Sequence, residues 1–261
     1  MSVRPKKRLG QHFLTDDGVV RRIVAAVGAP AGASVVEIGP GEGALTGALL
    51  DRYPGLVALE VDPEAVAHLG RRFPALDVRE GDVLDADWTA LADALGGPLW
   101  VVGNLPYYIT SPILFALLAA REHVARAVVM VQKEVADRLA APHGSKTYGT
   151  LSVYFALYAD AQLVLDVPRQ CFHPEPAVES AVVALDFAAA SPPDVPFEAL
   201  QRTVRAAFGQ RRKMLRNSLG PLAARAGVDL PAWAATLRPE AVSPADFVRL
   251  ARHLAPAPTP S

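Results

Sequence analysis

Short apolar runs alternate with amphipathic segments along the chain as far as residue 188. Apolar runs bounded by Gly, Pro or charged residues are typical of buried strands, and apolar residues recurring every three or four positions are typical of helices. The runs predict strands at residues 34–38, 56–61, 76–78, 99–102, 125–132, 162–167 and 180–187. The periodic segments predict helices at residues 15–27, 44–50, 63–72, 90–94, 111–120, 133–140 and 150–157, the first with Thr15 as its N-cap. This alternation predicts an open α/β sheet.

The pattern changes after residue 188. Residues 188–196 read AAASPPDVP, a composition typical of a linker. Helical periodicity then continues to the end, with helices predicted at residues 197–208, 213–219, 221–226, 230–237 and 244–254. The chain is therefore expected to form an α/β domain over residues 1–188 and a small all-helical domain over residues 189–261.

Composition narrows the class of protein. The 261 residues are 51% hydrophobic and 20% charged, which is enough apolar material for a substantial core. A basic N-terminus without an apolar core segment is not a secretory signal, and no apolar run is long enough to span a bilayer. The single Cys171 excludes an internal disulfide, and the six His show no metal-ligand spacing, so no metal site is expected. We expect a cytoplasmic protein that is not attached to a membrane.

Charge is unevenly distributed although the formal net charge is only −1. Residues 1–22 carry six Lys or Arg against two Asp, and residues 197–220 carry six against one Glu. The rest of the chain is therefore strongly acidic. Two basic stretches in an acidic chain indicate contact with a polyanion, although two solvated helix faces would give the same pattern.

A glycine-rich turn follows the first long strand. Residues 39–43 read Gly-Pro-Gly-Glu-Gly and lead into a helix, which is the arrangement of a nucleotide-binding unit. The next strand reaches Glu60, 21 residues after Gly39, where an acidic side chain can accept from ribose hydroxyls. Asp82, after the following strand, can accept from an adenine amine or can simply end a turn. The G-x-G-x-G spacing is similar to that of class I S-adenosylmethionine-dependent methyltransferases, with nicotinamide binding or an empty tight turn as alternatives.

The tetrapeptide Asn-Leu-Pro-Tyr at residues 104–107 follows the strand at 99–102. The Asn104 side chain and the Leu105 carbonyl, held by the rigid Pro106, offer two acceptors, and Tyr107 offers a flat face for stacking. Two acceptors beside an aromatic plane suit adenine N6, because gripping its hydrogens favours the pyramidal amine whose lone pair can attack. The alternative is a proline turn that merely ends a strand.

Phe172 opens a second rigid loop, Phe-His-Pro-Glu-Pro, at residues 172–176. A Phe held between polar residues and prolines is placed to present its ring to a ligand. The alternative is an ordinary core residue.

Six sequence blocks together resemble those of the ribosomal RNA adenine dimethyltransferase family. They are residues 8–14 (RLGQHFL), 37–41 (EIGPG), 104–109 (NLPYYI), 130–135 (MVQKEV), 172–180 (FHPEPAVES) and 208–217 (FGQRRKMLRN). The resemblance runs from residue 4 to residue 254, and so many long blocks in one order are highly specific. It implies a Rossmann-like class I methyltransferase sheet with S-adenosyl-L-methionine as the cofactor.

The resemblance also implies roles for individual residues. The S-adenosylmethionine site would be lined by His12, Leu14, Gly39, Glu60, Asp82 and Asn104. Asn104 and the Leu105 carbonyl would hold the target amine, and Tyr107 and Phe172 would stack on the flipped base.

Among members of the family, the blocks are most similar to those of enzymes that dimethylate N6 of two adjacent adenosines near the 3′ end of 16S rRNA. The implied protein is an rRNA (adenine-N6,N6)-dimethyltransferase of ribosome biogenesis, a monomer whose partner is 16S rRNA or the immature small subunit. Large-subunit rRNA dimethylation and a non-catalytic role in small-subunit assembly are the alternatives. The pI of about 6.6 departs from the basic character of many relatives, which weakens the case for strong non-specific RNA affinity.

Overall fold

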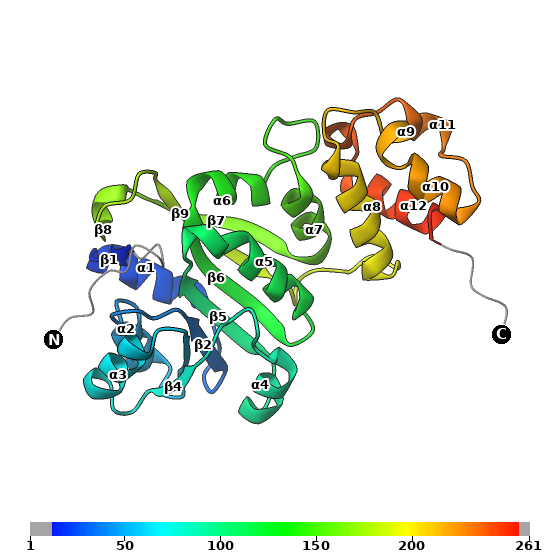
Figure 1. The fold of residues 1–261 in the computed structure, drawn as a ribbon. Coiled ribbons are helices and arrows are strands. Elements are labelled where there is room, and N and C mark those ends of the chain that lie inside the picture. The colour runs from blue at the N-terminus through cyan, green and yellow to red at the C-terminus, as the bar shows by residue number, and fades with distance from the viewer. Residues whose placement is uncertain (1–11, 256–261) are drawn as a thin grey trace. The chain divides into compact units, whose positions relative to one another are not determined.

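The computed structural model describes residues 12–255, which form two compact units (Figure 1). Among the described residues, the sheet unit comprises residues 12–136 and 160–189. The helical unit comprises residues 137–159 and 190–255. Residues 137–159 thus cluster with the C-terminal helices, whereas the sequence analysis assigned them to the first domain. The roles of the two domains stay predictions.

A mixed seven-stranded sheet forms the centre of the sheet unit, with the strand order β4-β3-β2-β5-β6-β9-β7. Its strands are β2 (Ser34–Ile38), β3 (Val57–Glu60), β4 (Asp77–Glu80), β5 (Leu99–Asn104), β6 (Val124–Gln132), β7 (Asp160–Val167) and β9 (Ser180–Asp186). Strands β2 to β6 pair in parallel, and β9 runs antiparallel to both β6 and β7. The predicted α/β class is confirmed.

Helices alternate with these strands, as the periodicity predicted. They are α1 (Asp17–Val27), α2 (Thr46–Arg52), α3 (Pro63–Arg72), α4 (Trp88–Leu95), α5 (Thr110–Ala119) and α6 (Lys133–Leu139). Asp62 and Asp87 cap α3 and α4 by accepting from backbone N–H groups of the first turn. Thr15 is not the N-cap of α1 as predicted. The side chain of Asp16 accepts from Val19 N instead, because the hydroxyl of Thr15 donates to the carbonyl of Cys171.

The chain order produces a switch point between β2 and β5. From β2 the chain moves through β3 to the edge strand β4, and it then returns to place β5 on the other side of β2. Neighbouring parallel strands whose connections leave in opposite directions open a crevice at their carboxyl ends. Gly103 brings β5 close to β2 there, since a methyl group on it would lie 2.7 Å from the Ile38 carbonyl oxygen.

The core surrounds the middle of the sheet. Strands β6 and β9 are buried along most of their lengths, whereas the edge strand β4 is partly exposed. Continuous apolar runs such as Val128–Val131 are typical of strands covered on both faces. This packing holds the carboxyl ends of β2 and β5 in fixed positions.

The helical unit contains α7 (Thr150–Tyr158), α8 (Phe197–Gly209), α9 (Leu215–Ser218), α10 (Gly220–Ala226), α11 (Ala232–Ala235) and α12 (Pro244–His253). The ring of Phe208 packs against those of Tyr148 and Phe247, and the Tyr148 hydroxyl donates to the carbonyl of Val242. No helix within residues 12–255 is long and apolar enough to cross a membrane.

Candidate active site

A cavity of about 280 Å³ lies at the carboxyl ends of β2, β3 and β5. All six residues predicted to line the cofactor site contribute to its wall, namely His12, Leu14, Gly39, Glu60, Asp82 and Asn104. Leu105 and Tyr107, predicted to hold the target base, line the same cavity. The structure therefore brings the predicted cofactor residues together with three of the four residues predicted to hold the base, Phe172 being the exception.

The glycine turn exposes backbone to this cavity. Gly39 and Gly41 adopt φ angles of 61° and 59°, which side-chain-bearing residues rarely adopt. A methyl group on Gly39 would meet no atom within 4 Å, so the space beside its backbone is open. Helix α2 begins at Thr46, two residues later than predicted, because residues 41–45 continue the turn. A ligand can thus approach the main chain directly at Gly39.

Glu60 stands at the end of β3 with only 4% of its surface exposed. Its two carboxyl oxygens accept from the N–H groups of Gly41 and Asp62, at 3.0 and 2.9 Å. Burial raises the pKa of Glu60, and these two hydrogen bonds oppose the rise. Glu60 therefore fixes the glycine turn as well as facing the cavity.

Glu37 also lies in the cavity wall, a position that was not predicted from the sequence. It is 1% exposed, lines the cavity and accepts from the Thr46 hydroxyl at 2.7 Å. Burial raises the pKa of Glu37 to about 8, against the opposing effect of the Thr46 hydrogen bond. The available signal was an acidic residue inside an otherwise apolar strand, one residue before the glycine turn.

Asp82 has the turn role that the sequence left open, and acceptance from an adenine amine stays a prediction. Its side chain accepts from Leu84 N at 2.9 Å, as a turn aspartate does, and it also lines the cavity. Together with Glu37 and Glu60 it gives the cavity three carboxyl groups. The described residues of the lining include no Lys or Arg.

The segment at 104–107 ends β5 and enters a 3₁₀ helix, Tyr107–Ile109. Leu105 N donates to the Met130 carbonyl at 3.0 Å, which ties the segment to β6. Asn104 Nδ2 donates to the carbonyl of His12 at 2.9 Å.

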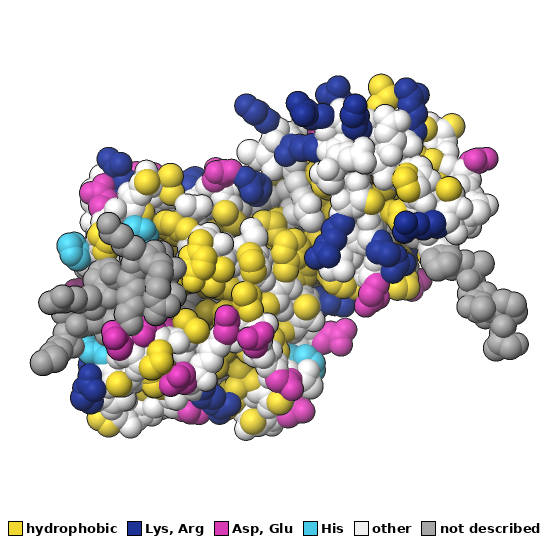
Figure 2. Space-filling model, in the orientation of Figure 1, with side chains coloured by type: hydrophobic (Ala, Val, Ile, Leu, Met, Phe, Trp, Pro, Cys, Tyr) yellow, Lys and Arg dark blue, Asp and Glu magenta, His cyan; other side chains and the backbone are white. Residues whose placement is uncertain are grey.

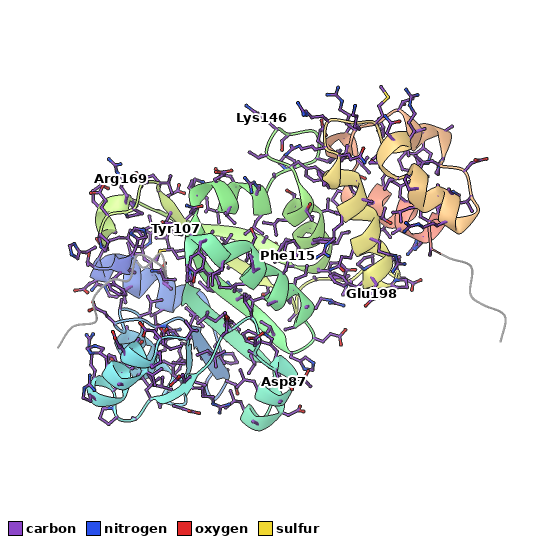
Figure 3. All side chains as sticks on the ribbon, in the orientation of Figure 1. Asp87, Tyr107, Phe115, Lys146, Arg169 and Glu198 are labelled. Carbon is purple, nitrogen blue, oxygen red and sulfur yellow. The ribbon has the colours of Figure 1, made fainter. Side chains whose placement is uncertain are left out.

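The side chain of Tyr107, labelled in Figure 3, contacts Ser180 through its hydroxyl and His12 through one face of its ring. Its hydroxyl is 2.6 Å from Ser180 Oγ, and its face stacks on the imidazole of His12 with centroids 5.5 Å apart. Burial raises the pKa of Tyr107. Ser180 is a further residue that the sequence analysis missed, because β9 lies far from Tyr107 in the sequence.

Phe172 does not lie as predicted. Its ring is only 4% exposed, packs in the core cluster with Leu14, and is absent from the described residues lining the cavity. The reason is a short antiparallel pairing of β1 (Phe13–Leu14) with β8 (Phe172–His173), which turns the ring inward. The interpretation of the loop as presenting this ring is corrected, and stacking on a base stays a prediction.

The basic segment predicted at Arg4, Lys6, Lys7 and Arg8 lies outside the described residues. Within residues 12–255, no group of three or more His, Cys, Asp or Glu side chains is arranged to hold a metal ion.

The fold and site are those of a class I S-adenosylmethionine-dependent methyltransferase. A dimethyladenosine transferase from Plasmodium falciparum has a similar fold, with a TM-score of 0.73 at 24% identity, over 92% of this chain and 96% of that one. The 23S rRNA methyltransferase ErmE matches with a TM-score of 0.63 at 29% identity, over 93% and 99% of the two chains.

The chain belongs to the ribosomal RNA adenine dimethylase family, whose model matches residues 3–254. Relatives named ribosomal RNA small subunit methyltransferase A include a Salinibacter ruber protein, 50% identical over 96% of this chain and 85% of its own length. The protein of that name from Methylococcus capsulatus is 48% identical, over 97% and 98% of the two chains.

The cavity fits S-adenosylmethionine, the methyl donor of this class. The donor carries positive charge, ribose hydroxyls and an adenine ring. Of the residues that line the cavity, Glu60 would accept from the ribose hydroxyls and Asp82 from the adenine amine, and Ile38 and Val61 would give the ring apolar surface. The open backbone at Gly39 leaves room for close approach.

Proposed function

We propose that this protein dimethylates N6 of two adjacent adenosines near the 3′ end of 16S rRNA. The observation that carries the proposal is that Asn104 and Leu105 open onto the same cavity as Gly39 and Glu60. The adenine amine, hydrogen-bonded at the end of β5, therefore faces the methyl donor bound at the ends of β2 and β3. The names of the relatives support the small subunit as the source of the substrate.

When bound, S-adenosylmethionine supplies a methyl group already activated on a sulfonium sulfur. Asn104 Oδ1 and the Leu105 carbonyl accept the two hydrogens of N6, which favours the pyramidal amine with its lone pair free to attack. Holding the amine in line with the methyl carbon provides most of the acceleration. The amine loses a proton to solvent after transfer. One hydrogen then remains, so either acceptor can hold the monomethyl amine for a second round.

The target adenine must leave its stack before N6 can reach the acceptors. Extruding a base costs a few kcal/mol, and stacking on an aromatic ring offsets part of that cost. Tyr107 lines the cavity beside Asn104 and serves as this stacking surface. Stacking by Phe172 requires its ring to leave the core packing described above.

RNA contact is assigned to the helical unit and to the basic N-terminal segment. In the helical unit, the basic residues of the stretch at 197–220 are all exposed, namely Arg202, Arg205, Arg211, Arg212, Lys213 and Arg216. Figure 2 shows Lys and Arg side chains gathered on the surface of this unit. Arg211 also donates to the carbonyl of Lys146 at 2.6 Å, which joins the loop before α7 to this basic surface. Such side chains position RNA through its phosphates.

The cellular setting is also proposed. The substrate is 16S rRNA within an immature small subunit in the cytoplasm, and the protein acts as a monomer. The 29% identity to a 23S rRNA methyltransferase makes large-subunit rRNA the alternative substrate.

Methyl transfer from labelled S-adenosylmethionine tests the proposal, with naked 16S rRNA, naked 23S rRNA and unmethylated small subunits as acceptors. Primer extension then maps the modified nucleotides. We expect two adjacent dimethyladenosines near the 3′ end of 16S rRNA. Modification confined to 23S rRNA would show that large-subunit rRNA is the substrate instead. The absence of transfer to any acceptor would favour a non-catalytic assembly factor.

Asn104→Ala should lower the transfer rate by roughly a hundredfold or more, as expected for loss of a group aimed at the reacting atoms. Equilibrium binding of S-adenosylmethionine should remain measurable, since the contacts at Gly39 and Glu60 are intact. Gln162→Ala, which removes an exposed amide bonded to Asp160, is the matched control and should behave as wild type. Near-normal dimethylation by Asn104→Ala would refute the assigned role.

A further inference from the structure

His12 contacts two of the residues assigned to the target base, Asn104 and Tyr107. Its carbonyl oxygen accepts from Asn104 Nδ2 at 2.9 Å. Its imidazole stacks on the Tyr107 ring with an interplanar angle of 26°. Its Nδ1 lies 2.7 Å from the carbonyl oxygen of Pro174, which anchors the imidazole at its other edge. The resemblance to the family assigned His12 only to the cofactor site.

The bond from Asn104 to His12 decides which end of the amide is available to a ligand. An asparagine side chain has one donor end and one acceptor end. With Nδ2 engaged by the His12 carbonyl, Oδ1 is the end left for the target amine. Turning the amide over would place its oxygen against the carbonyl oxygen of His12, which is unfavourable. The main chain at His12 therefore sets the acceptor that the reaction needs.

The carbonyl of His12 is held firmly by the segment that follows it. Phe13 and Leu14 pair with β8, and Leu14 is buried in the core. Thr15 then donates to the Cys171 carbonyl through both its N–H and its hydroxyl, at 2.8 and 3.0 Å. Phe13 also lies against the glycine turn, since a methyl group on Gly41 would be 3.0 Å from its ring.

We propose that His12 is a positioning residue for methyl transfer. Its carbonyl orients the Asn104 amide, and its imidazole supports one face of Tyr107, so that the target adenine is received on the remaining surface of that ring. This inference rests on the proposed function, because it concerns the same reaction. It assigns to His12 an effect on the transfer step rather than on donor binding.

Variants of the His12 side chain separate its stacking on Tyr107 from its bond to Pro174. His12→Phe keeps a planar ring against Tyr107 but loses the bond to Pro174, and His12→Leu keeps volume without an aromatic face. An aromatic pair contributes about 0.5–1.5 kcal/mol, so His12→Leu and His12→Ala should slow single-turnover transfer about 3- to 10-fold. His12→Phe should retain most of the wild-type rate.

The experiment measures single-turnover methylation of unmethylated small subunits at saturating S-adenosylmethionine, and separately the Kd of S-adenosylmethionine by calorimetry. The Kd should change by less than about threefold in all three variants, a smaller effect than the loss of one aromatic contact would cause. His123→Ala removes a histidine that bonds Thr89 outside the described cavity lining, and it should match wild type in both measurements.

The outcomes distinguish this inference from the proposed function. If wild type transfers no methyl group to the subunits, the proposed function fails. If wild type is active and His12→Leu is as fast as His12→Phe, the positioning role is overturned. It is also overturned if the loss of rate is matched by an equal rise in Kd, since His12 would then act on the donor. The Phe–Leu comparison keeps the test decisive should His12→Ala fold poorly.

Discussion

At the scale of single residues, Ser180 and Tyr107 share one partly buried hydrogen bond. The two hydroxyl oxygens are 2.6 Å apart, and Ser180 is fully buried at the start of β9. Removing either hydroxyl leaves the other without this partner and frees the ring edge. A buried hydroxyl that loses its partner costs about 1–3 kcal/mol.

We therefore expect Ser180→Ala and Tyr107→Phe each to slow single-turnover transfer by about tenfold, the equivalent of one such hydrogen bond. The double variant should be no slower than either single one, because the same bond is lost. Ser191→Ala, on the exposed linker, is the control. Additive losses in the double variant would show that the two hydroxyls act separately.

The raised pKa of Glu37 predicts a pH-dependent stability. Its pKa is raised from 4.5 to about 8 by burial, so between these values the folded state holds a proton that the unfolded chain has lost. The free energy of unfolding therefore falls as pH rises through this window. Glu37→Gln cannot ionise and can still accept from the Thr46 hydroxyl.

Thermal unfolding at several pH values tests this assignment. From about pH 5 to about pH 8, Glu37→Gln should gain Tm relative to wild type by a few degrees. Glu122→Gln, whose side chain is 78% exposed, should show no such trend. A constant difference between Glu37→Gln and wild type across the window would contradict a proton held at Glu37.

The candidate site could be predicted from sequence wherever local pattern determined position. Gly39 and Glu60 sit at strand ends that the periodicity located, and Asn104 is the last residue of β5. The inward ring of Phe172 and the bond to Ser180 depend on contacts between distant segments, which no local pattern records.

At the scale of secondary-structure elements, β5 approaches β2 through the missing side chain of Gly103. Since a methyl group there would lie 2.7 Å from the Ile38 carbonyl, Gly103→Ala must separate the two strands that carry the glycine turn and Asn104. Overpacking of this kind costs about 1–3 kcal/mol.

Urea unfolding of Gly103→Ala should show that loss of stability, together with weaker binding of S-adenosylmethionine. Gly70→Ala is the matched control, because Gly70 lies on the exposed side of α3 with no atom within 4 Å of the added methyl group. It should stabilise the protein by about 0.5–1 kcal/mol. Equal stability of the two variants would contradict the close approach.

Strands and helices with clear periodicity were predicted within a few residues of their observed limits. Strands β1 and β8 were not predicted, because two residues are too few to show alternation. The predicted helices at 213–219 and 230–237 are shortened to α9 and α11. Short helices depend on packing with neighbours rather than on their own sequence.

At the scale of the whole molecule, the basic residues gathered on the helical unit contrast with a net charge of −1. Arg212 and Lys213 are exposed and suit a test better than Arg211, which is bonded to Lys146. Each cation that contacts a phosphate contributes about one unit to the dependence of log K on log salt concentration.

Reversing the charge of both residues, as Arg212→Glu with Lys213→Glu, should weaken binding to 16S rRNA and flatten its salt slope by about one to two units. Filter binding at a series of salt concentrations measures both quantities. The control, Arg52→Glu with Arg71→Glu, reverses two exposed charges in the sheet unit. An unchanged slope in the first variant would place the RNA contact elsewhere.

The pairing of β1 with β8 places Phe13 beside His173, although most of the sequence of the sheet unit lies between them. Protein synthesis delivers the first of these segments long before the second, by roughly ten to thirty seconds at typical elongation rates. A nascent chain halted before Phe172 already carries the glycine turn and Asn104 but has no strand on which to dock His12. Assembly of a competent methyl-transfer centre is therefore a late event in the synthesis of this protein.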